Sequence, residues 1–411
     1  MSDSAGAAAS GAPLAGLKVV ELGTMYAAPT AGRMLRDFGA DVVKVEDPVV
    51  GDYARQWIPQ KEGLSLGFAR LNAGKRSVGV DLRTDDGRDL VRRLVADADV
   101  VVESFRPGRL EAWGLGPDAL HEINPGLVIA RVSGFGQTGP NRLLPGFGTV
   151  AETASGFANV NGQPDSPPTS PPFGFADSIA GLSAAMGVSM ALFNRSRTGR
   201  GEVVDVALYE PLMFIIGDMF LKYTALGEIQ QRIGNSTGAA SPRGIYEAGD
   251  GKYLSIAASN QAIATRLFAA MGVPEVIDDP RYATNAARLE NNDEVQAMVI
   301  EWCKRAPRDQ VLEILEKFEV VSAPVNDASD VVADPHFQER TLVEITGSEI
   351  LRNTLMPGPV LHLAGYDGPE YDGVPRVGEQ TRQILTERLG LDAAELDRLA
   401  AAGVINDGEG Q

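Results

Sequence analysis

The sequence predicts an α/β protein with a doubly wound, mostly parallel sheet and a second, smaller α+β unit. Short runs rich in valine recur through the first 132 residues, and segments with helical periodicity separate them. Near-continuous apolar runs of this length are typical of strands that are covered on both faces. Alternation of strands and helices at this spacing predicts right-handed crossovers and therefore a parallel sheet. The 411 residues also exceed the size of about 250–300 at which single cores stop growing, so we expect two domains.

Five strands are predicted in the first third of the chain, at residues 17–22, 41–45, 77–80, 99–102 and 127–132. Between the first two, residues 30–38 have helical spacing and end at Gly39, a residue type that readily takes the left-handed conformation after a helix. Residues 85–96 form the next predicted helix, with acidic residues in its first turn. Residues 1–13 are small and polar, and we expect a disordered tail there.

The middle of the chain is less regular. Residues 133–175 are loop-rich, with prolines concentrated at 164–172. A long helix of small residues is predicted at 177–193, and a short strand at 203–207. Residues 210–223 are apolar and helical, and we expect them to begin a traverse to a second domain.

The second domain is predicted to be smaller, and it follows a flexible, glycine-containing loop at 234–244. Its expected elements are a hairpin and two helices, at residues 245–257, 261–271 and 294–305. From about residue 334 the chain is again extended and turn-rich. It closes with two predicted helices, at residues 380–389 and 393–402.

Composition argues against several classes of function. The net charge is −18, and a surface this acidic repels phosphate backbones, so we expect no nucleic-acid partner. The single cysteine, Cys303, fits a reducing compartment and is expected in a core helix. The three histidines are scattered and no HExxH or CxxC spacing occurs, so no metal is expected. No apolar run reaches the roughly 18 residues of a membrane span. We therefore predict a cytoplasmic protein with no membrane partner.

One stretch escapes the acidic excess. Residues 70–109 hold nine Arg or Lys against seven Asp or Glu. Within them, Phe105 and Arg106 follow the fourth strand, where a guanidinium beside an aromatic ring can bind phosphate and stack on a purine. Solvated surface charge is the alternative interpretation. The loop after the first strand lacks GxGxxG, which argues against NAD, and GxSxG is absent as well.

Asp177 is the acid singled out by its position, at the start of the long helix and before a run of small residues. In a purely structural role it would be an N-cap, worth about 1 kcal/mol. A helix N-terminus also keeps a carboxylate ionised, and ionised carboxylates are nucleophiles. We expect Asp177 to cap the helix, to act as a nucleophile, or both, with the small residues giving a bulky ligand close access.

Nine short stretches, taken in order, carry a resemblance to a known family: LAGLKVVEL (14–22), RDFGADVVKVE (36–46), LNAGKRS (71–77), SFRPG (104–108), SGFGQTGP (133–140), ADSIAG (176–181), RTGRG (197–201), DPRYATN (279–285) and APVND (323–327). Each motif alone is weak, but their order and spacing over residues 14–390 resemble the class III CoA-transferases. That family includes formyl-CoA and carnitine CoA-transferases, and α-methylacyl-CoA racemases share its fold.

The resemblance implies an enzyme that moves CoA from an acyl-CoA thioester, such as succinyl-CoA, to a free carboxylic acid. Asp177 matches the family's catalytic aspartate, which would pass through an aspartyl-acyl anhydride and an aspartyl-CoA thioester. The CoA contacts that the resemblance implies are Asn72, Lys75, Phe105 and Arg106, with Arg109 close enough to assist.

The resemblance also implies a homodimer of two interlocked rings, in which each large domain is completed by its own C-terminal segment. The large domain would be residues 14–203 plus 335–411, and residues 243–330 would form the small domain. Residues 204–242 would link the two, and the loop at 234–244 is a candidate lid.

Four positions depart from the family pattern. Asp47 and Ala112 stand where many members have arginines, so contacts to adenine and phosphate are expected to differ. Tyr26 replaces a glutamine that assists formyl transfer, which argues against formate or oxalate. Phe147 stands where the racemases have a histidine and cannot exchange a proton. The alternatives are an acyl-CoA racemase using Asp177 with an unidentified second base, and a catalytically silent acyl-CoA-binding protein.

Overall fold

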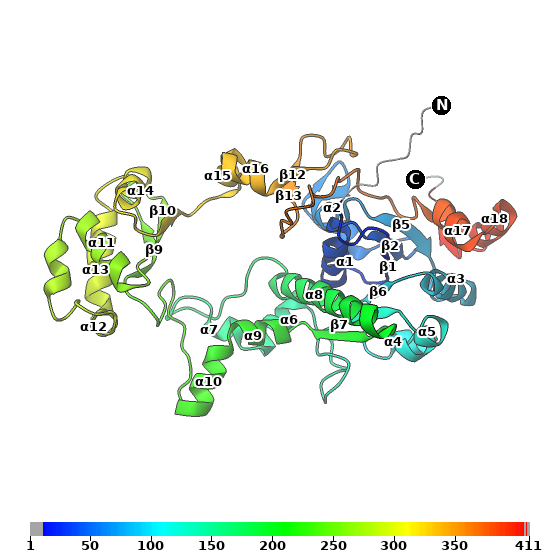
Figure 1. Cartoon of the computed structure of the whole chain (residues 1–411), viewed down its shortest axis with the longest axis horizontal. Helices are drawn as coiled ribbons and strands as arrows, with labels where there is room; N and C mark the ends of the chain where they lie inside the picture. Colours follow the sequence, from blue (N-terminus) through cyan, green and yellow to red (C-terminus); the bar gives the residue numbers. More distant parts are fainter. Residues whose placement is uncertain (1–10, 407, 409–411) are drawn as a thin grey trace. The chain divides into compact units, whose positions relative to one another are not determined.

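The computed structural model describes residues 11–406 and 408, and the chain divides into two units (Figure 1). The first unit runs up to Phe157 and takes in Ser170–Asp218 and the chain from Pro335 onward. The second consists of Ala158–Thr169 and Met219–Asp334. It therefore includes much of the segment that we assigned to a linker.

A seven-stranded sheet forms the centre of the first unit, in the order β14-β5-β2-β1-β6-β7-β8. Its parallel strands are β1 (Lys18–Glu21), β2 (Asp41–Glu46), β5 (Arg76–Val80), β6 (Val100–Glu103), β7 (Val128–Ser133) and β8 (Val203–Ala207). The short strand β14 (Ile405–Asn406) pairs antiparallel with β5 at one edge. The six parallel strands match the predicted positions, and the mostly parallel α/β fold is confirmed.

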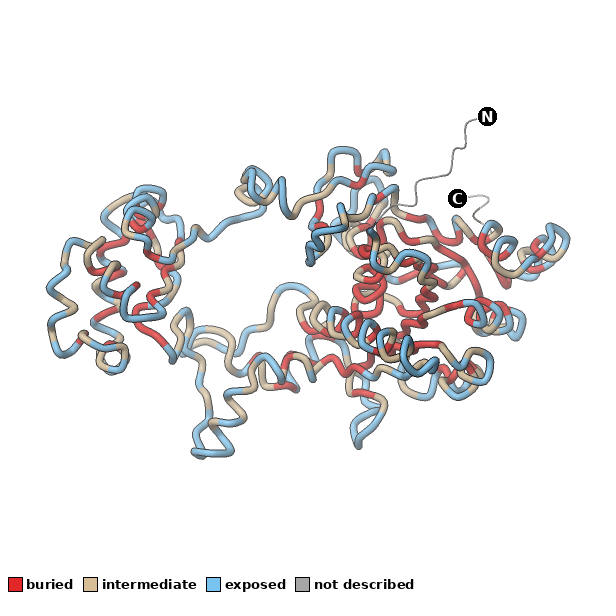
Figure 2. The backbone as a smooth tube through the Cα atoms, viewed as in Figure 1, coloured by how far each residue is buried: buried red, intermediate tan, exposed pale blue. Residues whose placement is uncertain are grey.

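The valine-rich strands arise because both faces of the sheet are covered. Successive residues on a strand point to opposite faces, so Val19 and Val20 belong to two different apolar clusters. The same division separates Val100 from Val101. All four side chains are fully buried, and buried positions coincide with the sheet strands in Figure 2.

Helices from distant parts of the sequence complete the two layers. One face carries α1 (Ala27–Asp37) and α8 (Phe175–Thr198). The other face carries α3 (Asp85–Ala96), α4 (Arg109–Ala112), α5 (Pro117–Ile123), α17 (Thr381–Leu389) and α18 (Ala393–Ala401). The C-terminal helices therefore share a core with the N-terminal half of the chain, because their apolar side chains cover the face that α3 leaves open.

Helix α8 corrects two expectations. Among the described residues it is long and apolar enough, by length and composition alone, to cross a membrane, whereas we expected no segment of that length. The second expectation was that the small residues of this helix give a bulky ligand close access. The helix instead packs with them into an apolar cluster of the first unit. A Cβ on Gly181 would lie 2.5 Å from the Cβ of Thr30 and 2.6 Å from the carbonyl oxygen of Ala27. At this glycine the small residues admit helix α1 rather than a bulky ligand.

The remaining elements of the first unit are short: α2 (Leu66–Asn72), α6 (Gly148–Ala154), α9 (Glu210–Ile215), α16 (Pro335–Arg340), and the hairpins β3 (Gln60–Lys61) with β4 (Leu64–Ser65) and β12 (Leu342–Glu344) with β13 (Leu355–Pro357). Of the predicted N-terminal tail, residues 1–10 lie outside the described residues. Within the rest of this range, Ala12 lies against Gly39, on which a Cβ would lie 2.6 Å from the Cβ of Ala12.

The second unit has a three-stranded antiparallel sheet of β9 (Arg243–Glu247), β10 (Tyr253–Ala257) and β11 (Ser322–Pro324). Its helices are α11 (Gln261–Ala270), α12 (Asn285–Glu290), α13 (Asn292–Cys303), α14 (Arg308–Lys317) and α15 (Ala328–Ala333). Cys303 is fully buried in the core of this unit, as predicted. The single helix predicted at 210–223 is instead two helices, α9 and α10 (Gly217–Leu226). Helix α7 (Phe157–Val160) begins at Phe157, where the first stretch of the first unit ends.

Candidate functional site

The strand order creates a crevice at one edge of the parallel sheet. Strand β1 lies between β2 and β6, so the loop after β1 leads to one side of the sheet and the loop after β6 to the other. In open α/β sheets, ligands bind beyond the carboxyl ends of the strands at such a switch point. Two cavities of this structure, of about 90 and 340 Å³, lie at that edge and share Asp177 among their lining residues.

The smaller cavity is built from the ends of four parallel strands. Its walls include Thr24 after β1, Ser104 after β6, Gly134 after β7 and Leu208 after β8. The larger cavity adds side chains from three other segments, Trp57, Glu152 and Phe173. Met25, Tyr26 and Phe147 line both cavities together with Asp177. The carboxylate of Asp177 is therefore the acid common to the two spaces.

Asp177 lies in the first turn of α8 but does not cap it. The N-cap residue is Gly174, which has no side chain to form a capping bond. The capping interpretation of Asp177 is therefore wrong, because the helix begins two residues earlier than predicted. The carboxylate instead accepts hydrogen bonds from its own backbone N–H and from that of Gly148.

Gly148 reaches Asp177 because it has no side chain. A Cβ at this position would lie 2.1 Å from Oδ2 of Asp177. Any other residue would push the carboxylate away or break the N–H contact from the start of α6. The glycine after Phe147 is thus a requirement of the site geometry.

The carboxyl of Asp177 ionises at unusually high pH. Burial, and then the charge of Glu152, raise its pKa to about 6, against the two backbone N–H groups, which lower it. Above that pH the carboxylate is ionised while poorly solvated. Such an anion is a stronger nucleophile than one that water stabilises.

Tyr26 forms a wall of both cavities and is held from three sides. Its ring packs on Trp57, with ring centroids 5.9 Å apart, and a Cβ on Gly174 would meet it at about 3.0 Å. Its hydroxyl oxygen accepts a hydrogen bond from the Arg70 guanidinium. The hydroxyl hydrogen remains able to donate, so Tyr26 can offer a fixed donor to a ligand beside Asp177.

A buried charge network anchors the loop that carries Tyr26. The ammonium of Lys44 contacts Glu21 at 2.9 Å, Asp52 at 2.7 Å and the carbonyl oxygen of Gly23 at 2.9 Å. Asp52 also accepts from the N–H of Met25 at 2.9 Å, and Met25 has a left-handed backbone with φ of 69°. Burial alone would lower the pKa of Lys44, but the surrounding carboxylates raise it. The network holds the loop in a conformation that a methionine seldom adopts.

Asn72 and Lys75, two predicted CoA contacts, belong to this network. The Lys75 ammonium has no exposed surface and is bound by Glu21 at 2.7 Å, by the Pro29 carbonyl at 2.9 Å and by Asn72 at 2.9 Å. Burial, followed by repulsion from Lys44, lowers the pKa of Lys75 to about 8 although Glu21 raises it. With all three donor directions used inside the fold, the geometry favours a structural role for both residues.

Phe105 and Arg109 lie in a different cavity, of about 400 Å³, on the β2 and β5 side of the crevice. The ring of Phe105 packs edge-on against Trp113 at 5.2 Å, and the Arg109 guanidinium lies 5.2 Å from the Trp113 ring centre. Arg83 lines the same cavity. Thr24 lines both this cavity and the smaller cavity beside Asp177, so the two spaces meet at the loop after β1.

Arg106 points elsewhere in this structure. Its guanidinium donates to the Leu143 carbonyl at 2.6 Å, and it is absent from the lining of the 400 Å³ cavity. Asp47, at one of the positions that depart from the family, pairs with Arg83 at 3.2 Å. A guanidinium is thus present beside Asp47, supplied from the loop after β5.

Sequence reasoning missed Arg83, Trp113, Gly148 and Glu152. Arg83 and Trp113 lie in or near the basic stretch but show no special spacing. Gly148 and Glu152 are four residues apart, a helical spacing that places both on one face. That signal was available, but the loop-rich composition around them concealed the helix.

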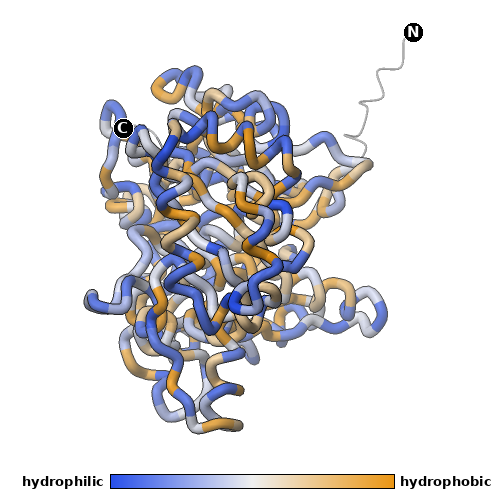
Figure 3. The backbone as a smooth tube through the Cα atoms, turned by 90° about the vertical axis from the view of Figure 1, so that its left-hand side faces the viewer, coloured by the Kyte–Doolittle hydropathy of each residue, from blue (hydrophilic) through white to orange (hydrophobic). Residues whose placement is uncertain are grey.

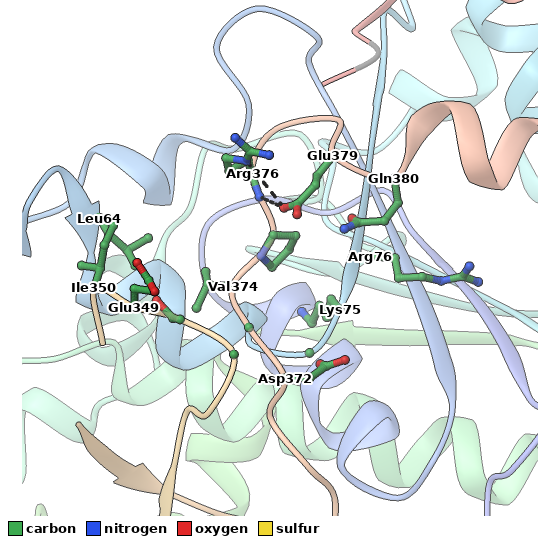
Figure 4. Close-up of a pocket in the computed structure, with 15 residues that line it drawn as sticks. Leu64, Lys75, Arg76, Glu349, Ile350, Asp372, Val374, Arg376, Glu379 and Gln380 are labelled. Carbon is green, nitrogen blue, oxygen red and sulfur yellow. Dashed lines mark hydrogen bonds and ion pairs between the residues drawn. The ribbon is translucent and has the colours of Figure 1, made fainter. Parts of the chain in front are cut away.

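A further cavity, of about 610 Å³, lies between the loop before β5 and the C-terminal segment (Figure 4). Charged side chains of both signs surround it, among them Arg76, Arg376, Glu349 and Asp372. Among the described residues, no cluster of three or more His, Cys, Asp or Glu is arranged to hold a metal ion.

Replacing Asp177 by Asn is expected to stabilise the protein at neutral pH. Because the folded pKa of Asp177 is about 6 against a usual 3.8, ionisation disfavours the folded state as pH rises through this range. Below about pH 4 the variant and the natural protein should unfold alike, and by pH 8 the variant should be stabler by up to about 3 kcal/mol. Denaturation between pH 4 and 8 measures this. The exposed Asp89→Asn is the control, and a pH-independent difference would contradict the assignment.

Comparison with known proteins identifies the family. A sequence model of CoA-transferase family III matches residues 14–381. Succinyl-CoA–D-citramalate CoA-transferase of Chloroflexus aurantiacus is 40% identical over 394 residues, covering 96% of this chain and 98% of the relative. Succinate–glutarate CoA-transferase of Agrobacterium fabrum is 35% identical, over 91% of this chain and 95% of the relative. The crystal structure of a CAIB/BAIF family protein from Brucella suis superposes with a TM-score of 0.81 at 35% identity, covering 92% of this chain and all of that one. These matches confirm the resemblance seen in the sequence motifs: the chain belongs to CoA-transferase family III and is a CoA-transferase.

Proposed function

We propose that this enzyme transfers CoA from an acyl-CoA donor to a small carboxylic acid by covalent catalysis on Asp177. The observation that carries the proposal is the Asp177 carboxylate itself, held by the Gly148 N–H where two cavities meet beyond the ends of the strands. The raised pKa of about 6 leaves it ionised at neutral pH. Among the residues that the structure describes, no lysine or arginine lines either cavity to neutralise its charge.

The reaction would proceed through four bond exchanges. An Asp177 oxygen attacks the thioester carbonyl, and the C–S bond breaks to give an aspartyl-acyl anhydride and CoA thiolate. The thiolate attacks the aspartyl carbonyl, releasing the donor acid and leaving an aspartyl-CoA thioester. The acceptor carboxylate then displaces the thiolate to form a second anhydride. Attack by the thiolate on its acyl carbon releases the new acyl-CoA and restores Asp177, with no net proton transfer.

The 400 Å³ cavity is the proposed site of the CoA nucleotide. Phe105 and Trp113 offer aromatic surface to a purine, and Arg109 and Arg83 offer guanidinium groups to phosphates. Arg83 would supply the positive charge that Asp47 does not. Arg106 could join only if it leaves the Leu143 carbonyl, and Asn72 and Lys75 would support the site from the buried network.

We infer from the relatives that the donor is succinyl-CoA or a similar thioester and that the acceptor is a small dicarboxylic acid. The citramalate, malate and glutarate enzymes named among the relatives share 34–40% identity with this chain. A racemase function has less support, because none of the three histidines lines the cavities beside Asp177. The lid role of residues 234–244 stays a prediction.

The enzyme is also proposed to be an interlocked homodimer. The chain leaves the first unit after Asp218 and re-enters it at Pro335, as a ring requires. Helix α8 exposes an apolar stripe at helical spacing, made of Leu182, Met186, Met190 and Phe193. On α9, Phe214 is 89% exposed. Patches of this kind mark protein interfaces, and Figure 3 shows the hydropathy along the chain. Sedimentation equilibrium should give about twice the chain mass of 43.6 kDa, and a single-chain mass would contradict the proposal.

Replacing Asp177 by Asn should lower the rate of CoA transfer at least about 10³-fold, since the amide is not a nucleophile. In the natural enzyme, incubation with succinyl-CoA followed by hydroxylamine should convert Asp177 to a hydroxamate, located by mass spectrometry. The Asp89→Asn control should keep full activity. Absence of the adduct during turnover would refute the covalent mechanism.

Replacing Arg109 by Ala should raise the KM for acyl-CoA about 10-fold or more, because a charge-assisted phosphate contact contributes about 1.5–3 kcal/mol. The KM for the acceptor acid should stay unchanged. Arg305→Ala, at an exposed arginine two residues after the end of α13, is the matched control. Equal KM values for the variant and the natural enzyme would place the nucleotide elsewhere.

A further inference from the structure

Glu152 is a buried carboxylate beside Asp177 that the reaction as written does not use. Its residue is 1% exposed, and it lines the 340 Å³ cavity together with Asp177. On α6 it lies one helical turn after Gly148, so the two residues share a helix face. Gly148 donates its N–H to Asp177. One face of a short helix therefore presents both a hydrogen-bond donor and a negative charge to the nucleophile.

Glu152 also contacts the first turn of α8. Its Oε1 accepts from the N–H of Ala176, the residue before Asp177, at 3.4 Å. The first N–H groups of a helix have no partner within the helix. The contact thus satisfies one of them and ties α6 to the turn that carries the nucleophile.

Glu152 is the second carboxylate on the described walls of the two cavities that Asp177 lines. Among the described residues lining the two cavities, the titratable side chains are Asp177, Glu152 and Tyr26. Arg70 lies behind Tyr26, at its hydroxyl.

Charged groups on the elements that pack against α8 have partners of their own. On β7, Arg131 pairs with Glu103 at 2.7 Å, and on α9, Glu210 accepts from the N–H of Ala207 at 3.4 Å. On α1, Arg33 pairs with Asp37 at 3.3 Å. On β8, Asp205 accepts from the N–H of Gln137 at 2.9 Å. No lysine or arginine stands among the described residues of the cavity walls to offset the charge of Glu152.

We propose that Glu152 is a positioning residue that keeps the Asp177 carboxylate a strong nucleophile, by fixing the first turn of α8 and by holding a like charge in the same cavity. The inference rests on the proposed function of Asp177. A neighbouring negative charge makes the ionised carboxylate less stable and therefore more ready to share its electrons with a thioester carbon. Glu152 itself forms no bond with the substrate.

Three variants separate the two parts of this role. Glu152→Gln removes the charge but keeps an amide oxygen that can accept the Ala176 N–H. Glu152→Ala removes both, and Glu152→Asp keeps the charge on a shorter side chain. The measurements are the pH profile of kcat/KM with succinyl-CoA and citramalate, and the rate of hydroxamate formation at Asp177. Glu122→Gln, at an exposed position of α5, is the matched control.

The natural enzyme should lose activity as pH falls through about 6, with the pKa of Asp177. Glu152→Gln should move this acid limb to lower pH and slow adduct formation about 10-fold, whereas Glu152→Asp should keep the limb near its natural position. Glu122→Gln should change neither. If Glu152→Gln folds and matches the natural enzyme in both readouts, the proposal is overturned. If Glu152→Gln does not fold, the other two variants decide. The proposal is overturned if the acid limb of the kcat/KM profile shifts as far in Glu152→Asp as in Glu152→Ala. If the natural enzyme itself gives no adduct, the proposed function of Asp177 has failed instead.

Discussion

Glu21 bridges two buried lysines, and the geometry of the site depends on this contact. One carboxylate oxygen meets Lys44 from β2 at 2.9 Å, and the other meets Lys75 from the loop before β5 at 2.7 Å. A buried charge that loses its partner costs about 3–5 kcal/mol. This contact therefore ties β1 to β2 and to the loop that leads into β5. Through Asp52 the same network fixes Met25 and the loop that carries Tyr26 to the cavities.

The strand order divides the site into two chemical environments. On one side of Thr24, the described residues that line the cavities beside Asp177 include acids and no lysine or arginine, so no cation on these walls offsets the charge of this half-buried carboxylate. On the other side the 400 Å³ cavity gathers aromatic rings with Arg83 and Arg109. A net charge of −18 describes the surface as a whole. In the proposed function, the highly anionic CoA would depend instead on these few guanidinium groups, which the fold places in a different cavity from Asp177.

Patterns that depend on neighbouring residues were readable from the sequence, and those that depend on distant ones were not. The valine runs predicted the parallel strands because both faces of the sheet are buried. The motif position of Asp177 placed it at the crevice. Lys75 and Asn72 matched family positions, yet only the fold shows that Glu21, 54 residues away from Lys75, binds its ammonium internally. The helical spacing of Gly148 and Glu152 was readable, but the need for a glycine at position 148 was not, because an Asp177 oxygen lies 2.1 Å from where a Cβ would be.

The central claim is that acyl-CoA bridges the two environments, with its thioester at Asp177 and its nucleotide beside Arg109. A crystal structure of the Asp177→Asn protein with succinyl-CoA tests this most directly, because the substrate cannot turn over. The account predicts the thioester carbonyl carbon about 3–3.5 Å from the residue 177 side chain. It also predicts the adenine ring in the 400 Å³ cavity, against Phe105 or Trp113. A thioester bound away from residue 177, for instance in the 610 Å³ cavity near Arg376, would contradict it.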